Sequence, residues 1–131
     1  MPLVKAYAAT ALVFLVVDLA WIGLFLRQIY EDQLGSLMRD TPAGWAAGVF
    51  YVAYIVALFH FAVRPALEKA RWSVAAGNGA ALGAIAYGTY TLTNFAIFAG
   101  WSVTLVVSDI AWGALLSGSS AAAGYLAARQ Q

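Results

Sequence analysis

The stretch "LVFLVVDLAWIGLFL", residues Leu12–Leu26, decides the class of fold because it is as apolar as a membrane helix. It belongs to an apolar segment that starts at Leu3, and a helix needs about 20 mostly apolar residues to cross a bilayer. Its one charged residue is Asp18. The length of the segment, the acid inside it and the lack of an A-x-A site after it favour a retained helix over a signal peptide.

The composition extends this interpretation to the whole chain. The 131 residues are 63% hydrophobic and 10% charged, whereas soluble domains are about 45–50% apolar and about 25% charged. A net charge of +1 without a basic run argues against nucleic-acid binding. Because the chain has no cysteine, disulfides, thiolate metal sites and cysteine nucleophiles are excluded.

Four apolar segments are long enough to cross a bilayer. The sequence therefore predicts an all-α integral membrane bundle, a single domain of four transmembrane helices at about residues 3–26, 45–63, 73–99 and 102–127. The last connection is so short that the third and fourth helices are expected to be adjacent and antiparallel. The second connection, "RPALEKAR", is expected to begin after a helix end because of Pro65. Gly35 is the expected break in the first connection.

The positive charges predict the orientation of the bundle. With four spans, the N-terminus, the second connection and the C-terminus share one side of the membrane. That side carries Lys5, Arg64, Lys69, Arg71 and Arg129, and the other side carries Arg27 and Arg39. The positive-inside rule then places both termini in the cytoplasm, N-in and C-in.

Small residues predict where helices pack closely. Gly79 and Gly83 form a G-x-x-x-G motif in the third segment, and Gly118 and Gly124 each end a small-xxx-small pair in the fourth. Such positions let helix backbones approach each other within a membrane. No predicted strand precedes the glycine-rich stretch, so a dinucleotide-binding loop is not indicated.

Two acids, Asp18 and Asp109, are predicted to lie at one depth. Asp18 lies eight residues before Leu26, and Asp109 lies seven residues after Ser102. At about 1.5 Å per residue, both lie roughly 10–12 Å below the outer ends of their helices. A charge deep in a membrane costs about 2.5–3.5 kcal/mol or more. Two close acids without a basic partner are therefore not expected to be ionised together.

Each acid is followed three residues later by a tryptophan, Trp21 or Trp112. Because helical side chains lean toward the N-terminus, each indole is expected to cover the turn that carries its acid and to donate its N–H to that carboxyl. Further polar groups fall in the same layer. The candidate ligand-binding residues are Asp18, Trp21, Tyr51, Tyr54, Tyr87, Tyr90, Thr91, Asn94, Asp109 and Trp112.

The sequence offers little for cofactor, metal or nucleophilic chemistry. His60, the only histidine, could be an axial ligand to a haem or chlorin, but a histidine near a helix end is more commonly an interface residue, so no cofactor is predicted. One histidine and dispersed acids do not make a metal site. The serines around Ser117 lie far from Asp18 along the membrane normal and outside any G-x-S-x-G motif.

Four stretches of the chain are "DLAWIGLFLRQIYEDQLG", "AGVFYVAYIVALFHFAVRPAL", "GAIAYGTYTLTNFAIFAGW" and "VVSDIAWGALL". They resemble a family of small bacterial membrane proteins, domain-of-unknown-function family 2177. The resemblance covers nearly the whole chain and includes D-[LI]-x-W in the first and last helices. It implies a multi-pass protein of the bacterial inner membrane with a role connected to lipids or the envelope. The family name itself carries no activity.

Three functions are compatible with the sequence. The favoured one is a membrane protein that binds a proton, a cation or a lipid-like polar ligand at the acidic layer, because acids inside membranes mark functional sites. The second is an accessory subunit of a larger membrane complex, or a homo-oligomer, in which the acids are structural. The third is a lipid-modifying enzyme with the acids as general acid and base; enzyme activity is the less favoured interpretation, and membrane lipid is the expected partner.

Overall fold

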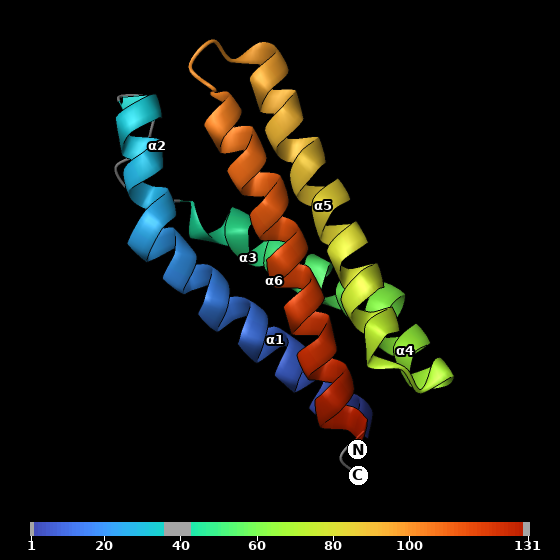
Figure 1. The fold of residues 1–131 in the computed structure, drawn as a ribbon. Helices are drawn as coiled ribbons and strands as arrows, with labels where there is room; N and C mark the ends of the chain where they lie inside the picture. Colours follow the sequence, from blue (N-terminus) through green and yellow to red (C-terminus); the bar gives the residue numbers. More distant parts are fainter. Residues whose placement is uncertain (1, 36–42, 130–131) are drawn as a thin grey trace.

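The computed structural model describes residues 2–35 and 43–129, and within these ranges every regular element is a helix. In chain order the elements are α1 (Pro2–Trp21), the π-helical turn η1 (Ile22–Leu26), α2 (Arg27–Leu34), α3 (Gly44–Leu58), the π-helical turn η3 (Phe59–Val63), α4 (Arg64–Lys69), α5 (Trp72–Ile97) and α6 (Val103–Arg129). The short elements continue one another, so the chain forms four long helices (Figure 1). The all-α prediction is confirmed.

Three of these helices are long and apolar enough to cross a membrane. They are Leu3–Leu24, Gly44–Lys69 and Val103–Arg129. The chain therefore has the helices of a multi-pass membrane protein. The remaining long helix, α5, has 26 residues, includes several glycines and threonines and two asparagines, and is not among these three.

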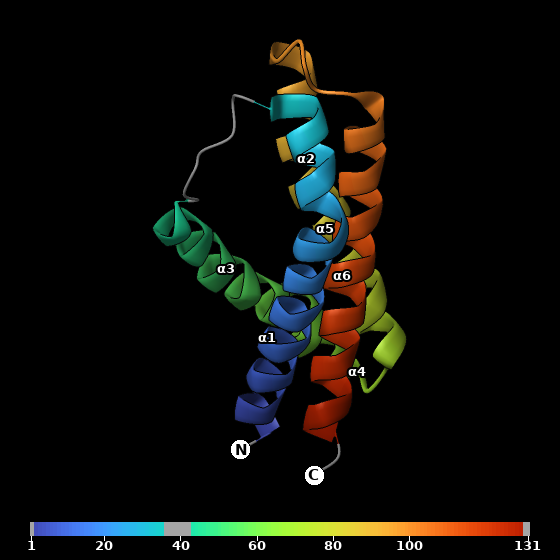
Figure 2. The same ribbon diagram turned by 90° about the vertical axis from the view of Figure 1, so that its left-hand side faces the viewer.

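Helix α6 is the central element of the bundle. It packs along α5 on one side, as an antiparallel hairpin, and against α1 on the other (Figure 1). The α3 helix runs obliquely to these three, and its N-terminal half diverges from them (Figure 2). Residues 44–50 are all exposed, whereas η3 packs against α5 and α6. The start of α1 and the end of α6 lie at the end of the bundle that also holds the turn between α4 and α5.

Glycines allow the close approach of α6 to both neighbours. A Cβ on Gly79 would lie 2.7 Å from the carbonyl oxygen of Ser117, and a Cβ on Gly83 would overlap the carbonyl of Gly113. On the other side of α6, a Cβ on Gly124 would overlap the Thr10 side chain of α1. The small-residue motifs therefore mark helix contacts, as predicted.

The prediction that the second helix ends before Pro65 is wrong. The helix continues from α3 through η3 and α4 to Lys69, and the connection to α5 shrinks to Ala70 and Arg71. In an α-helix the missing N–H of Pro65 would leave the carbonyl of Phe61 without a donor. Here Asn78 of α5 donates its side-chain N–H to that carbonyl at 3.1 Å. The chain leaves the helix at Ala70, which has a left-handed φ of 53°.

The first helix continues beyond the predicted membrane span. The π-helical turn η1 carries it past Leu26 into α2, which ends at Leu34. Gly35 follows with a φ of +47°, so its predicted role as the break is confirmed. The rest of the first connection, residues 36–42, lies outside the described residues.

Candidate functional site

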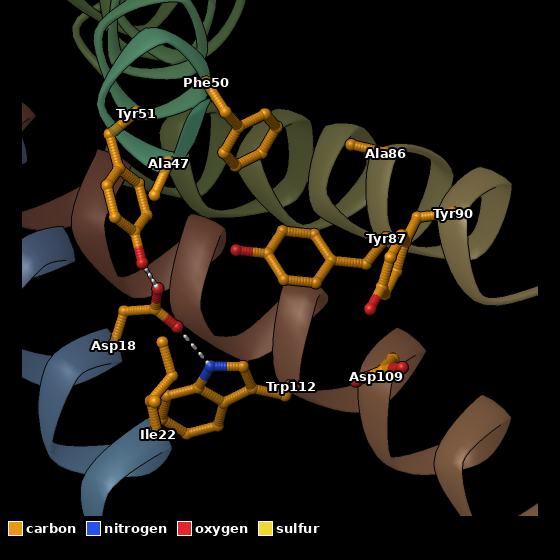
Figure 3. Close-up of a pocket in the computed structure, with 10 residues that line it drawn as sticks. All are labelled: Asp18, Ile22, Ala47, Phe50, Tyr51, Ala86, Tyr87, Tyr90, Asp109 and Trp112. Atoms are coloured by element: carbon orange, nitrogen blue, oxygen red, sulfur yellow. Dashed lines mark hydrogen bonds between the residues drawn. The ribbon is translucent and has the colours of Figure 1, made fainter. Parts of the chain in front are cut away.

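A cavity of about 410 Å³ lies between α1, α3, α5 and α6 (Figure 3), a volume in the range of small-molecule sites. Six of the predicted ligand-binding residues line it. These are Asp18, Tyr51, Tyr87, Tyr90, Asp109 and Trp112. The remaining lining residues are Ile22, Ala47, Phe50 and Ala86. Asp18 and Asp109 thus face one space, as the comparison of their depths predicts.

Asp18 is held by hydrogen bonds from two other helices. The Tyr51 hydroxyl of α3 donates to Oδ2 at 2.5 Å, and the Trp112 indole N–H of α6 donates to Oδ1 at 3.0 Å. The side chain is 4% exposed. Each carboxyl oxygen therefore has a donor, and the acid joins α1, α3 and α6 at one point.

The prediction that each tryptophan donates to the acid of its own helix is wrong for Trp112. Its indole reaches across the α1–α6 interface to Asp18 instead of back to Asp109. Trp21 stacks on Trp112, with ring centroids 4.5 Å apart and an interplanar angle of 14°. The two D-x-x-W motifs meet because α1 and α6 pack side by side. The spacing of residues within one helix cannot predict a partner on a neighbouring helix.

Asp109 is held by a different set of groups. It is also 4% exposed, and the Thr91 hydroxyl of α5 is hydrogen-bonded to its side chain. Thr91 Oγ1 in turn accepts the indole N–H of Trp101 at 3.0 Å. Because a hydroxyl has a single hydrogen, Thr91 donates it to the carboxyl. The other carboxyl oxygen, Oδ2, is buried and has no hydrogen-bond partner among the described residues.

The two acids are separate centres. Figure 3 shows the Tyr87 side chain between them, with its hydroxyl directed toward Asp18 and Tyr51. In the described part of the chain, the ion pairs join Arg27 to Glu31 and Arg64 to Glu68. Neither buried acid has a basic partner within that part.

The exposed fractions of the lining residues show which side of the cavity is open. Phe50 of α3 is 43% exposed and Tyr90 of α5 is 47% exposed, whereas the two acids are buried. The cavity therefore opens between α3 and α5, where α3 diverges from the bundle (Figure 2), and its acids lie deep.

The other predicted ligand-binding residues lie outside the lining. Trp21 and Thr91 lie behind it, in contact with Trp112 and Asp109. Tyr54 is buried, and its hydroxyl and that of Ser117 are hydrogen-bonded at 2.6 Å. Asn94 is half-buried near the end of α5, where its backbone carbonyl accepts the N–H of Phe98.

His60 is exposed on η3, outside the lining, with its ring against Phe61. Within the described residues, no three side chains of the metal-binding types gather in a way that could hold a metal ion.

The apolar residues of the lining and Trp101 were not predicted from the sequence. Ile22, Ala47, Phe50 and Ala86 are ordinary membrane-helix residues, and nothing in their spacing marks a cavity. Trp101 lies in the connection between α5 and α6 but is only 7% exposed, because its indole bonds to Thr91. Only Thr91, which was among the predicted polar residues, could have indicated that a donor such as the Trp101 indole lies nearby.

Comparison with known proteins identifies the family. The family model described as "Predicted membrane protein (DUF2177)" matches residues 3–126, which confirms the resemblance seen in the sequence. No curated protein and no solved structure matches the chain.

Proposed function

We propose that this chain, which belongs to the family of predicted membrane proteins DUF2177, binds an amphiphilic molecule in the cavity between its helices. One observation carries the proposal. Two buried acids, Asp18 and Asp109, line a cavity whose other walls are largely apolar and aromatic. Burying an acid in a membrane protein is costly, and such acids are commonly found at binding or transport sites.

The lining suits a molecule with an apolar chain and one polar end. Ile22, Phe50 and Ala86 offer surface to a chain, while the carboxyls and the hydroxyls of Tyr87 and Tyr90 offer hydrogen-bonding groups to a head. If the acids were purely structural, every carboxyl oxygen would be expected to accept a hydrogen bond within the protein. Asp18 meets that condition, but Asp109 does not.

The opening supports entry from the side, out of the lipid. The part of α3 that borders it is exposed and apolar, with Trp45 at 78% and Val49 at 65% exposure. In a membrane these side chains contact lipid tails, so a chain can move from the bilayer into the cavity without crossing water. Membrane lipid is thus the proposed source of the ligand.

We further propose that α5 is a fourth span and that the protein lies in the bacterial inner membrane with both termini in the cytoplasm. At about 1.5 Å per residue, α5 is long enough to cross. Its packing along α6 supports this, because a helix that follows a membrane span shares its depth. The excess of basic residues near the termini and the α4–α5 turn supports the orientation.

A cavity-filling variant tests the binding proposal. Ala86→Phe adds a ring to the lining without changing either acid, and Ala81→Phe adds the same ring at an exposed position of the same helix. The probe is 12-bromododecan-1-ol, whose bromine quenches tryptophan fluorescence, added to purified protein in lipid nanodiscs. We expect saturable quenching in the wild type and in Ala81→Phe, and a loss of about tenfold or more in affinity in Ala86→Phe. Equal affinities in all three proteins would refute a site in this cavity.

A further inference from the structure

We propose that Asp109, and not Asp18, receives the polar end of the ligand, and that this end is an ammonium group. The inference rests on the proposed function, since it assigns the head group of the same amphiphile. It follows from two observations. The two carboxyls differ in how many of their oxygens accept a hydrogen bond, and the residues around them are largely aromatic and apolar.

The geometry of Asp18 leaves it little to offer a ligand. Both of its oxygens already accept a hydrogen bond, one from Tyr51 and one from Trp112. Those donors come from α3 and α6, so replacing them would disturb the contacts that hold the cavity walls together. Asp18 is therefore a positioning residue that fixes Tyr51 and Trp112 in the lining.

Asp109 is built differently, because only part of its carboxyl is occupied. The Trp101–Thr91 chain of hydrogen bonds fixes the side chain, and Oδ2 remains buried without a partner among the described residues. An unsatisfied buried acceptor costs about 1–3 kcal/mol, and more when it is charged. A donor on a ligand in the cavity would remove that cost.

The walls favour a cation as the donor. The faces and edges of Phe50, Tyr87, Tyr90 and Trp112 surround the space beside the acids (Figure 3), and none of the described residues that line it is a lysine, arginine or histidine. Aromatic rings attract ammonium groups, most strongly where water is excluded. A carboxylate or phosphate head would be repelled by the two acids, so the structure assigns a lipophilic amine without an adjoining anionic group.

Tyr90 is placed to close the site over such a head group. Figure 3 shows its hydroxyl end directed toward Asp109, and its ring packs edge-on against Trp101 with centroids 5.7 Å apart. Trp101, which also bonds to Thr91, thus holds the Tyr90 ring near Asp109. A head group at Asp109 would have its chain directed along Tyr87 and Phe50.

The test compares two probes with one chain and different heads, 12-bromododecylamine and 12-bromododecan-1-ol, by tryptophan quenching in nanodiscs. In the wild type we expect the amine to bind about tenfold or more tightly than the alcohol. Asp109→Asn keeps the acceptor for Thr91 but removes the charge, so it should lower the affinity for the amine by about tenfold or more and change that for the alcohol by less than about threefold. Asp32→Asn removes an exposed acid and should change neither affinity.

The ranking of the probes in the wild type needs no variant, so the inference stays testable even if Asp109→Asn does not fold. Equal binding of amine and alcohol, both abolished by Ala86→Phe, would overturn the ammonium assignment and leave the cavity proposal standing. A preference for the amine that survives in Asp109→Asn would overturn the role of Asp109. Binding of both probes that Ala86→Phe does not weaken would remove the proposed function as well.

Discussion

At the scale of single residues, the two acids have different roles although the sequence presents them in nearly the same motif. Asp18 is saturated by donors from two helices, whereas Asp109 keeps one oxygen without a partner among the described residues. The burial of each acid could be expected from the apolar helix that carries it. Its donors could not, because Tyr51 and Trp112 reach Asp18 from other helices.

Tyr51→Phe should destabilise the bundle by about 1–2 kcal/mol, because it removes one of the two donors to a buried acid. The expected change is a lower midpoint of unfolding in mixed micelles with increasing SDS. The control is Thr89→Val, since the Thr89 hydroxyl is exposed and bonds to the Ile85 carbonyl of its own helix. A loss in Tyr51→Phe no larger than in the control would show that the bond to Asp18 is not stabilising.

At the scale of elements, the α5–α6 hairpin was predictable and the second helix was only partly so. Gly79 and Gly83 form a G-x-x-x-G motif, which predicts close packing against a neighbouring helix. The contact of α5 with α6 agrees with that prediction. Pro65 suggested a helix end because its missing N–H breaks the ladder of hydrogen bonds. The donor that replaces it, Asn78, comes from α5 and has no signature in the second helix.

Gly83→Ala and Gly77→Ala should have opposite effects on stability. A methyl group on Gly83 overlaps the Gly113 carbonyl and forces α5 from α6, at a cost of about 1–3 kcal/mol. A methyl group on Gly77 meets no atom within 4 Å, so its better helix propensity should be neutral or stabilising by up to about 1 kcal/mol. SDS titration of both variants measures the difference. Equal midpoints would contradict the close contact of α5 with α6.

At the scale of the whole molecule, the number and class of helices could be predicted, but the cavity could not. Hydropathy places helices in a membrane without fixing their crossing angles. The cavity exists because α3 runs obliquely and leaves Phe50 and Tyr90 at an opening (Figure 2). That divergence depends on contacts of η3 with α5 and α6, which arise only on folding.

The proposed topology makes a prediction about accessibility, which is simple to read because the chain has no cysteine. In intact bacterial cells, a membrane-impermeant maleimide should label Ser102→Cys, between α5 and α6, but not Glu68→Cys, near the α4–α5 turn. Permeabilised cells provide the control, since both variants should then react. Labelling of Glu68→Cys alone in intact cells would show the opposite orientation. Equal labelling of the two variants would show that α5 does not cross the membrane.

The most direct measurement of the central claim is a photocrosslinking map with a long-chain alcohol that carries a diazirine near its head. Protein in nanodiscs is irradiated, and the modified residues are identified by tandem mass spectrometry. Binding in the cavity predicts adducts concentrated on the lining residues at the head-group end, Tyr87, Tyr90 and Asp109, that disappear in Ala86→Phe and persist in Ala81→Phe. Adducts spread over outward-facing residues such as Val107 and Leu115, with the same pattern in all three proteins, would contradict it.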